Sequence, residues 1–151
     1  MASTSAKMFR LIFVFGSNLS GHHGKGAALF AKTHYGAIQH RGIGFQGDSY
    51  AIPTKGKRTT DGKYPILPLS EIAVSVKRFL EDARTHQELP FVVTRIGCGL
   101  AGFTDDQMAP LFAGAPDNCE FDPAWAQFGL KPWTVATLTN AKFLNPYLKE
   151  H

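Results

Sequence analysis

Residues 10–31 have the sequence RLIFVFGSNLSGHHGKGAALFA, which predicts a strand, a glycine-rich loop and a helix in direct succession. Residues 11–15 are aliphatic or aromatic without a polar interruption, a pattern typical of a strand buried on both faces. We expect this strand to stop at Gly16. Apolar residues at helical spacing between 24 and 37 predict the helix, and Gly36 predicts its end. A strand that leads through a loop into a helix is the unit of layered α/β folds.

The same unit recurs in the second half of the chain. Residues 89–96 predict another buried strand, which the Gly-Cys-Gly sequence at 97–99 interrupts. Residues 104–112 then predict a helix, with Thr104 as its N-cap and two aspartates in its first turn. The chain therefore contains two strand-loop-helix units.

Further elements are predicted outside these units. Residues 49–53 predict a short strand that ends at its proline, and residues 133–138 predict another strand. The clearest helix is predicted from Ser70, as its N-cap, to Ala83, because apolar residues fall on one side of it and charged residues on the other. Strands that alternate with helices favour a single α/β domain, over residues 9–151, with a largely parallel sheet.

Length and composition are those of one globular domain. The chain has 151 residues, of which 44% are hydrophobic and 19% charged, which excludes a coiled coil, a collagen-like repeat and a disordered tail. The 16 Lys and Arg residues against 12 Asp and Glu give a net charge of +4. Two cysteines, Cys98 and Cys119, are too few for a disulfide scaffold and predict reduced thiols in a cytosol.

The first residues predict neither a secretion signal nor a membrane segment. Residues 1–8 are small and polar, and we expect them to form a flexible leader. The apolar run at 11–15 is far shorter than the roughly 20 residues that a membrane helix needs. We therefore expect a cytoplasmic protein without a membrane partner.

The first glycine-rich loop is a candidate anion site. It leaves a buried strand and opens a helix, where backbone N–H groups are unpaired and the helix end carries about half a positive charge. A simple strand-to-helix turn is the alternative, because short glycine motifs often match by chance. Two known phosphate-binding patterns do not match: Gly24-Lys25 is followed by Gly26 instead of Ser or Thr, and the dinucleotide-binding order of glycines is absent.

Lys55 lies just past a predicted strand end, where open α/β sheets form their ligand crevices. Residues 55–63 contain four basic side chains against Asp61 alone, so this segment has a local charge of four minus one, +3. Such a charge suits phosphate or a nucleic-acid backbone, and a solvated surface loop is the alternative.

Residues 95–102, RIGCGLAG, form a second glycine-rich strand end. Either this backbone surrounds the phosphates and ribose of a ligand or it packs against a helix. We do not expect Cys98 to act as a nucleophile, because no histidine lies near it in the sequence. His22 and His23 are adjacent and have no partner at zinc-ligand spacing, so we expect neither a metal nor a cofactor.

Together these segments resemble the macro domain family. The blocks that carry the resemblance are GSN at 16–18, GKGAALF at 24–30, IPTK at 52–55 and RIGCGL at 95–100, which match in order and spacing. More narrowly, they resemble the branch that holds the terminal ADP-ribose protein glycohydrolase and the DNA ADP-ribosyl glycohydrolase antitoxin, which removes ADP-ribose from thymidine in single-stranded DNA. The resemblance covers about residues 11–115 and is weak over 112–151.

The resemblance implies a three-layer α/β/α fold with a central mixed sheet and an ADP-ribose cleft over the strand ends. It implies that Lys55 is the catalytic residue. Protein-directed members of the branch carry an aspartate directly after Gly-Cys-Gly-Leu, whereas this chain has Ala101, and the small residue there favours the DNA-directed chemistry. The implied ligand-binding residues are Gly16, Ser17, Asn18, Gly24, Lys25, Gly26, Ala27, Thr54, Gly97, Cys98, Gly99, Leu100, Ala101 and Gly102.

The function expected from this resemblance is binding of ADP-ribose and its removal from a modified nucleic acid or protein, with single-stranded DNA among the partners. Lys55 would either attack C1 of the distal ribose as a neutral amine or orient the ribose as a cation, and the sequence leaves both open. Two other functions remain: a non-catalytic reader of ADP-ribose or a related nucleotide, and a nucleic-acid-binding module built on residues 55–63.

Overall fold

The computed structural model describes residues 10–134, 136 and 137. This part of the chain forms a five-stranded sheet in the order β2-β3-β1-β4-β5. β1 lies parallel to β3 and β4, β4 lies parallel to β5, and β2 is antiparallel to β3. The mixed, mostly parallel sheet confirms the expected α/β class. The strands are β1 (Ile12–Asn18), β2 (Gly44–Gln46), β3 (Ser49–Lys55), β4 (Phe91–Val93) and β5 (Cys119–Phe121).

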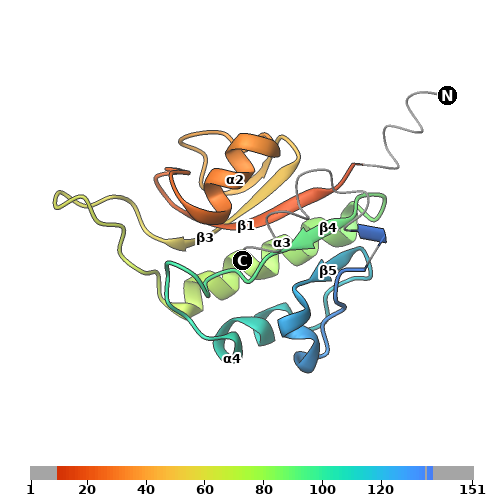
Figure 1. Cartoon of the computed structure of the whole chain (residues 1–151). Helices are drawn as coiled ribbons and strands as arrows, with labels where there is room; N and C mark the ends of the chain where they lie inside the picture. Colours follow the sequence, from red (N-terminus) through yellow and green to blue (C-terminus); the bar gives the residue numbers. More distant parts are fainter. Residues whose placement is uncertain (1–9, 135, 138–151) are drawn as a thin grey trace.

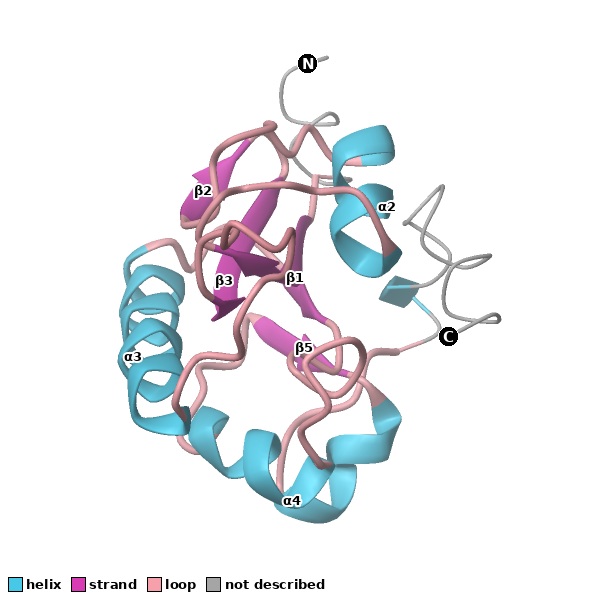
Figure 2. Ribbon diagram, turned by 90° about the vertical axis from the view of Figure 1, so that its left-hand side faces the viewer, coloured by secondary structure: helices cyan, strands magenta, loops and turns pink. Residues whose placement is uncertain are grey.

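Helices cover both faces of this sheet and make three layers (Figures 1 and 2). One face is covered by α2, and the other by α3, α4 and two 3₁₀ turns, η1 and η2. These elements are α2 (Gly26–His34), α3 (Leu69–Thr85), α4 (Asp105–Met108), η1 (Ala109–Phe112) and η2 (Pro123–Phe128).

The alternation of side chains along β1 explains the layers. Phe13 and Phe15 pack with Ala31 of α2, whereas Ile12 and Val14 belong to the larger cluster under α3. All four of these β1 side chains are fully buried, and each large apolar side chain buried in this way contributes about 1.5–3 kcal/mol. Packing on both faces therefore fixes the position of β1, including its carboxyl end.

The strands differ from the prediction at their carboxyl ends. β1 does not stop at Gly16 but runs to Asn18, because the backbone pairing with β3 continues to that residue. β3 likewise continues past Pro53 to Lys55, and the register between the two strands shifts beside that proline, as expected where a residue lacks an N–H to donate. β4 is shorter than the predicted 89–96, because after Val93 the chain turns away.

The helices agree more closely with the sequence pattern. α2 ends before Gly36, whose φ of 74° is the left-handed conformation that suits a glycine stop. α3 confirms the clearest predicted helix, although Pro68 and not Ser70 is its N-cap. The helix predicted over 104–112 is split into α4 and η1, and Pro110 in η1 accounts for the change because it has no N–H to donate.

The predicted strand at 133–138 is wrong within the described residues. Trp133 and Thr134 lie outside any strand, and residues 136 and 137 are helical. Positions 135 and 138 and the predicted leader at 1–8 lie outside the described residues. None of the helices described is both long and apolar enough to cross a membrane.

Candidate functional site

The carboxyl ends of β1, β3 and β4 meet at one edge of the sheet, because the three strands are parallel and β1 lies between the other two. Gly16 marks the meeting point. A Cβ atom at Gly16 would lie 3.7 Å from Thr54 Oγ1 on the β3 side and 3.7 Å from the Gly97 nitrogen on the β4 side. Three of the four sequence blocks therefore converge around one glycine of the central strand.

The first loop, residues 19–25, connects β1 to α2 and is held by Asn18 and by the segment that follows α2. The Asn18 amide donates to the His22 carbonyl and accepts from the His22 N–H, both at 3.0 Å. The buried Ser17 hydroxyl donates to the Gly42 carbonyl at 2.5 Å. The side chains of Ser17 and Asn18 thus hold the loop, and their predicted role toward a ligand stays a prediction.

Helix α2 begins at this edge without a side-chain cap. Its N-cap position is Lys25, no acidic residue lies in its first turn, and Gly24, Lys25 and Gly26 are exposed. The Leu29 N–H donates to the Lys25 carbonyl at 3.1 Å, so the N–H groups of the preceding turn have no intrahelical acceptor. An uncapped helix N-terminus favours an anion.

Lys55 is the last residue of β3 and is half-buried. Its backbone pairs with Asn18, and its carbonyl accepts from the Leu19 N–H at 2.9 Å, which ties the end of β3 to the start of the first loop. Thr54, one residue earlier, is buried, and its hydroxyl lies 3.4 Å from the Ser17 carbonyl. In the described part of the chain, no carboxylate forms an ion pair with Lys55.

Residues 56–66, here called the basic arm, project from this edge as a narrow antiparallel loop (Figure 1). Backbone hydrogen bonds cross the arm from Gly56 to Pro65 at 2.6 Å and from Thr59 to Lys63 at 2.8 Å. Asp61 accepts from the Thr59 hydroxyl and the Lys63 N–H, and the first of these bonds is the larger cause of its lowered pKa. Asp61, the single acidic side chain of the arm, therefore stabilises the turn of the arm.

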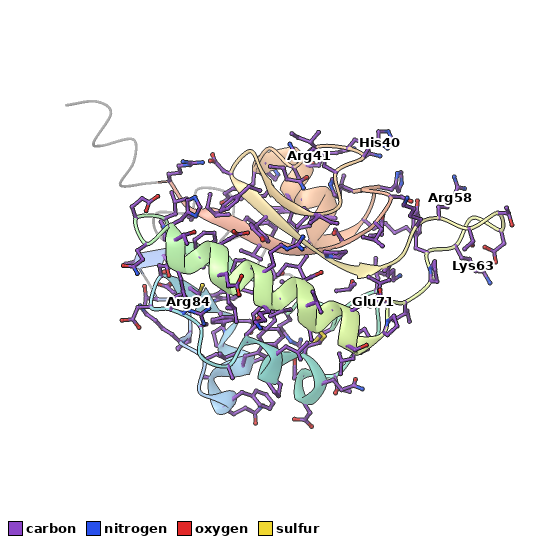
Figure 3. The ribbon with its side chains drawn as sticks, turned by 180° about the vertical axis from the view of Figure 1, so that it is seen from behind. His40, Arg41, Arg58, Lys63, Glu71 and Arg84 are labelled. Carbon is purple, nitrogen blue, oxygen red and sulfur yellow. The ribbon has the colours of Figure 1, made fainter. Side chains whose placement is uncertain are left out.

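The cations of the basic arm are exposed and have no ion-pair partner among residues 10–134, 136 and 137. Figure 3 shows Arg58 and Lys63 on the projecting arm, away from the body of the domain. The arm is tied to the first loop in two places: the Arg58 N–H donates to the Ser20 hydroxyl at 2.9 Å, and the His22 and Tyr64 rings stack in parallel at 6.1 Å.

The second loop, residues 94–104, is held from outside itself. Arg95 forms a bidentate ion pair with Asp105 of α4, with nitrogen–oxygen distances of 2.9 and 2.8 Å. The same carboxylate accepts from the Trp125 indole N–H at 2.7 Å and from the Cys98 thiol at 3.5 Å. Its pKa is lowered chiefly by the Arg95 hydrogen bonds. Thr104 is the N-cap of α4, as predicted, and it also forms a capping box with Gln107.

The backbone of the second loop is open beyond Cys98. Gly97 has φ of 80°, and a Cβ atom there would lie 2.9 Å from the Met108 sulfur, so only glycine fits. Gly99, Leu100 and Gly102 are exposed, whereas Ala101 is buried. Within the described residues nothing accepts from the N–H groups of Gly99, Leu100 and Ala101. Unpaired amides in such a turn can bind an anion.

The cysteine and histidine side chains of the two loops are structural. Burial raises the pKa of the Cys98 thiol to about 12, which disfavours a thiolate. His23 is fully buried, and its Nε2 lies 3.0 Å from the Arg41 carbonyl and 3.1 Å from Gln46 Oε1. No cluster of three metal-ligating side chains occurs in the part of the chain that the structure describes.

Sequence reasoning missed the contacts that hold the second loop. Asp105 could be placed in the first turn of a helix, but its partner Trp125 lies 20 positions later in an aromatic segment without a clear period. Ser20 was missed too, since its contact with Arg58 spans 38 positions. The available sequence signal for Asp105 was its place in the acidic first turn of the helix predicted after Thr104.

Comparison with known proteins leaves the family open. No family model and no curated protein matches the chain. A protein of unknown function from Bacteroides thetaiotaomicron has a solved structure that matches 68% of this chain and 78% of its own, with 20% identity and a TM-score of 0.45. Another structure from the same organism matches 68% and 80%, with 19% identity and a TM-score of 0.44. Likeness of this extent carries no argument about function.

Proposed function

We propose that this chain is an ADP-ribose-binding macro domain that hydrolyses an ADP-ribosyl linkage at C1 of the distal ribose. The convergence of the sequence blocks around Gly16 is the observation that supports this most directly. Blocks more than 70 residues apart in the chain, at Gly16 and Gly97, meet at the carboxyl edge, where open α/β sheets bind ligands.

The diphosphate of ADP-ribose is the group that the two loops suit. The uncapped N-terminus of α2 offers N–H groups and a partial positive charge on one side of Gly16. The unpaired N–H groups of Gly99, Leu100 and Ala101 lie in the loop on the other side. Backbone donors of this kind compensate phosphate charge without a metal ion.

Lys55 carries the chemistry in this proposal. A neutral amine attacks C1 of the distal ribose while the acceptor leaves with the bonding electron pair, and water then releases the ribose from the lysine. A charged Lys55 instead orients the ribose and stabilises the departing group. Its position at the end of β3, half-buried and without an ion-pair partner in the described residues, suits both roles.

A nucleic acid is the acceptor that the basic arm supports. Lys57, Arg58 and Lys63 are exposed, and the arm begins directly after Lys55. Replacing these three cations by alanine should reduce the slope of log affinity against log salt concentration by about 2 for a single-stranded DNA, at roughly 0.7 per charge. An unchanged slope would remove the arm from nucleic-acid binding.

The proposal is tested by release of ADP-ribose from ADP-ribosylated single-stranded DNA and from ADP-ribosylated protein. Lys55→Ala should abolish release while ADP-ribose binding remains detectable by calorimetry. Lys77→Ala is the matched control, since it removes an exposed lysine of α3, outside the basic arm, and should keep turnover. Turnover by Lys55→Ala at the wild-type rate would exclude Lys55 from the reaction.

A non-catalytic reader of ADP-ribose, or of a related nucleotide, is the second candidate. Ala101 favours it, because a buried methyl group stands where the protein-directed enzymes carry a carboxylate. Asp105, four positions later, does not replace that carboxylate, because Arg95 and Trp125 occupy it. Calorimetric binding of ADP-ribose without turnover of any modified substrate would select the reader.

A further inference from the structure

The Asp105 carboxylate joins three separate parts of the molecule. One oxygen accepts from the Arg95 Nε at 2.9 Å, from the Trp125 indole at 2.7 Å and from the Cys98 thiol at 3.5 Å. The other accepts from the Arg95 Nη2 at 2.8 Å. Trp125 is fully buried in the core on the α3 side of the sheet, so this carboxylate connects the second loop to a rigid part of the domain.

The open part of the second loop depends on these contacts. Asp105 bonds to Arg95 and Cys98, which lie on either side of Gly97 in the sequence. The Phe103 N–H donates to the Gly97 carbonyl at 2.8 Å, so the loop closes at the position that Asp105 holds on both sides. Within the described residues no side chain bonds to the N–H groups of Gly99, Leu100 or Ala101. Their placement therefore follows from the base of the loop.

We propose that Asp105 is a positioning residue, which fixes the second loop through Arg95 and Cys98 so that its free amides meet the diphosphate of ADP-ribose. This inference rests on the proposed function and deepens it. Asp105 does not touch the ligand. It acts by keeping the donors in place before the ligand arrives, which lowers the ordering cost of binding.

Charge and positioning predict opposite effects when the Asp105 charge is removed. A carboxylate near a diphosphate repels it, so a purely electrostatic role predicts tighter binding by Asp105→Asn, which would also release the Arg95 guanidinium from its partner. A positioning role predicts weaker binding, because the loop loses its bidentate anchor. The sign of the change in affinity therefore decides between the two.

The experiment is calorimetry with ADP-ribose on wild type, Asp105→Asn and Asp106→Asn. Asp106 is the matched control, since it also lies in the first turn of α4 but is exposed and makes no hydrogen bond or ion pair within the described residues. We expect a loss of affinity of about tenfold in Asp105→Asn and almost none in Asp106→Asn. Equal or tighter binding by a folded Asp105→Asn overturns the inference.

Tryptophan emission gives a second readout that a purely structural role would not change. The chain has two tryptophans, so Trp133→Phe leaves Trp125, which donates to Asp105, as the only reporter. ADP-ribose should shift the Trp125 emission in this background, and the shift should disappear when Asp105→Asn is added. Binding without any shift in the Trp133→Phe background overturns the link between ligand and network.

Arg95→Lys keeps the test decisive if Asp105→Asn does not fold. It retains the positive charge but not the bidentate geometry, and we expect a similar loss of affinity. Wild-type affinity in Arg95→Lys contradicts the inference and leaves the proposed function standing. If wild type itself does not bind ADP-ribose, the proposed function and the inference fall together.

Discussion

The first and second glycine loops leave neighbouring parallel strands at one edge of the sheet, but they are held in different ways. The first loop is held by Asn18, which bonds to His22, and by residues 39–46, which bond to Gly21 and His23. In the second loop, the anchor is Asp105, a residue of the next helix, and behind it Trp125. Both loops therefore depend on tertiary contacts, but the first is anchored on the segment that follows α2, whereas the second is anchored on α4 and, through Trp125, on the core under α3.

The largest effect should come from a clash at the close backbone approach between Gly21 of the first loop and Arg41. In Gly21→Ala, the new Cβ would lie 2.3 Å from the Arg41 nitrogen, at a residue whose φ is +67°. Neither atom can move without shifting backbone, so we expect the free energy of unfolding to fall by about 3 kcal/mol or more, measured by urea denaturation.

Gly102→Ala is the matched control from the second loop. Its φ is +79°, but no atom lies within 4 Å of the added Cβ, so strain acts there without a clash. We expect a loss of about 1 kcal/mol. Equal losses of unfolding free energy in the two variants would show that the clash at Gly21 adds nothing to the strain of its positive φ.

The next largest effect should come from Trp125→Phe, which should affect the second loop and not the first. Trp125→Phe removes the indole N–H that Asp105 accepts and leaves a small void in the core, so we expect a loss of about 2 kcal/mol. Hydrogen exchange should become faster at the Phe103 amide, which bonds to Gly97, and remain unchanged at the Gly21 amide, which bonds to Asn18. Faster exchange at both amides would contradict separate anchoring.

The smallest effect should appear in the pH dependence of stability. Burial lowers the pKa of His23 in the first loop, so the unfolded chain binds a proton there more readily. The free energy of unfolding should therefore decrease as the pH falls below about 6.5, toward the lower pKa of the folded state. The Arg95 hydrogen bonds lower the pKa of Asp105, so the second loop should lose stability only below about pH 4.

Urea denaturation between pH 7 and pH 3 measures both steps. His23→Gln should remove the decrease between pH 7 and pH 5.5 and keep the decrease below pH 4. Asp105→Asn should do the reverse. A single step that both variants alter equally would contradict the assignment of the two steps to His23 and Asp105.

Much of the fold could be predicted from the sequence because its signals are local. The apolar run of β1, the two-sided pattern of α3 and the Thr104 cap each depend on residues within a few positions of one another. The edge strands β2 and β5 were not predicted, because three residues carry too little pattern.

At the candidate site, the sequence could predict which strand ends come together but not the contacts that hold the loops. Gly16, Thr54 and Gly97 could be placed near each other because parallel strands end at one edge. The contacts from Ser17 to Gly42 and from Trp125 to Asp105 could not, because they join residues 25 and 20 positions apart that no periodicity connects. The side chains of Ser17 and Asn18 support the first loop, and their expected role toward a ligand stays a prediction.

The pairing of β4 with β1 spans three residues, and it joins the part of the sheet formed before residue 60 to the part formed after residue 90. A molecule seated on both glycine loops would bridge this short seam. Occupancy at a hundred times the dissociation constant adds about 2.7 kcal/mol against opening. Cleavage by a protease in the connection between α3 and β4 should therefore slow as the concentration of the proposed ligand, ADP-ribose, rises, which makes digestion a sensitive measure of occupancy.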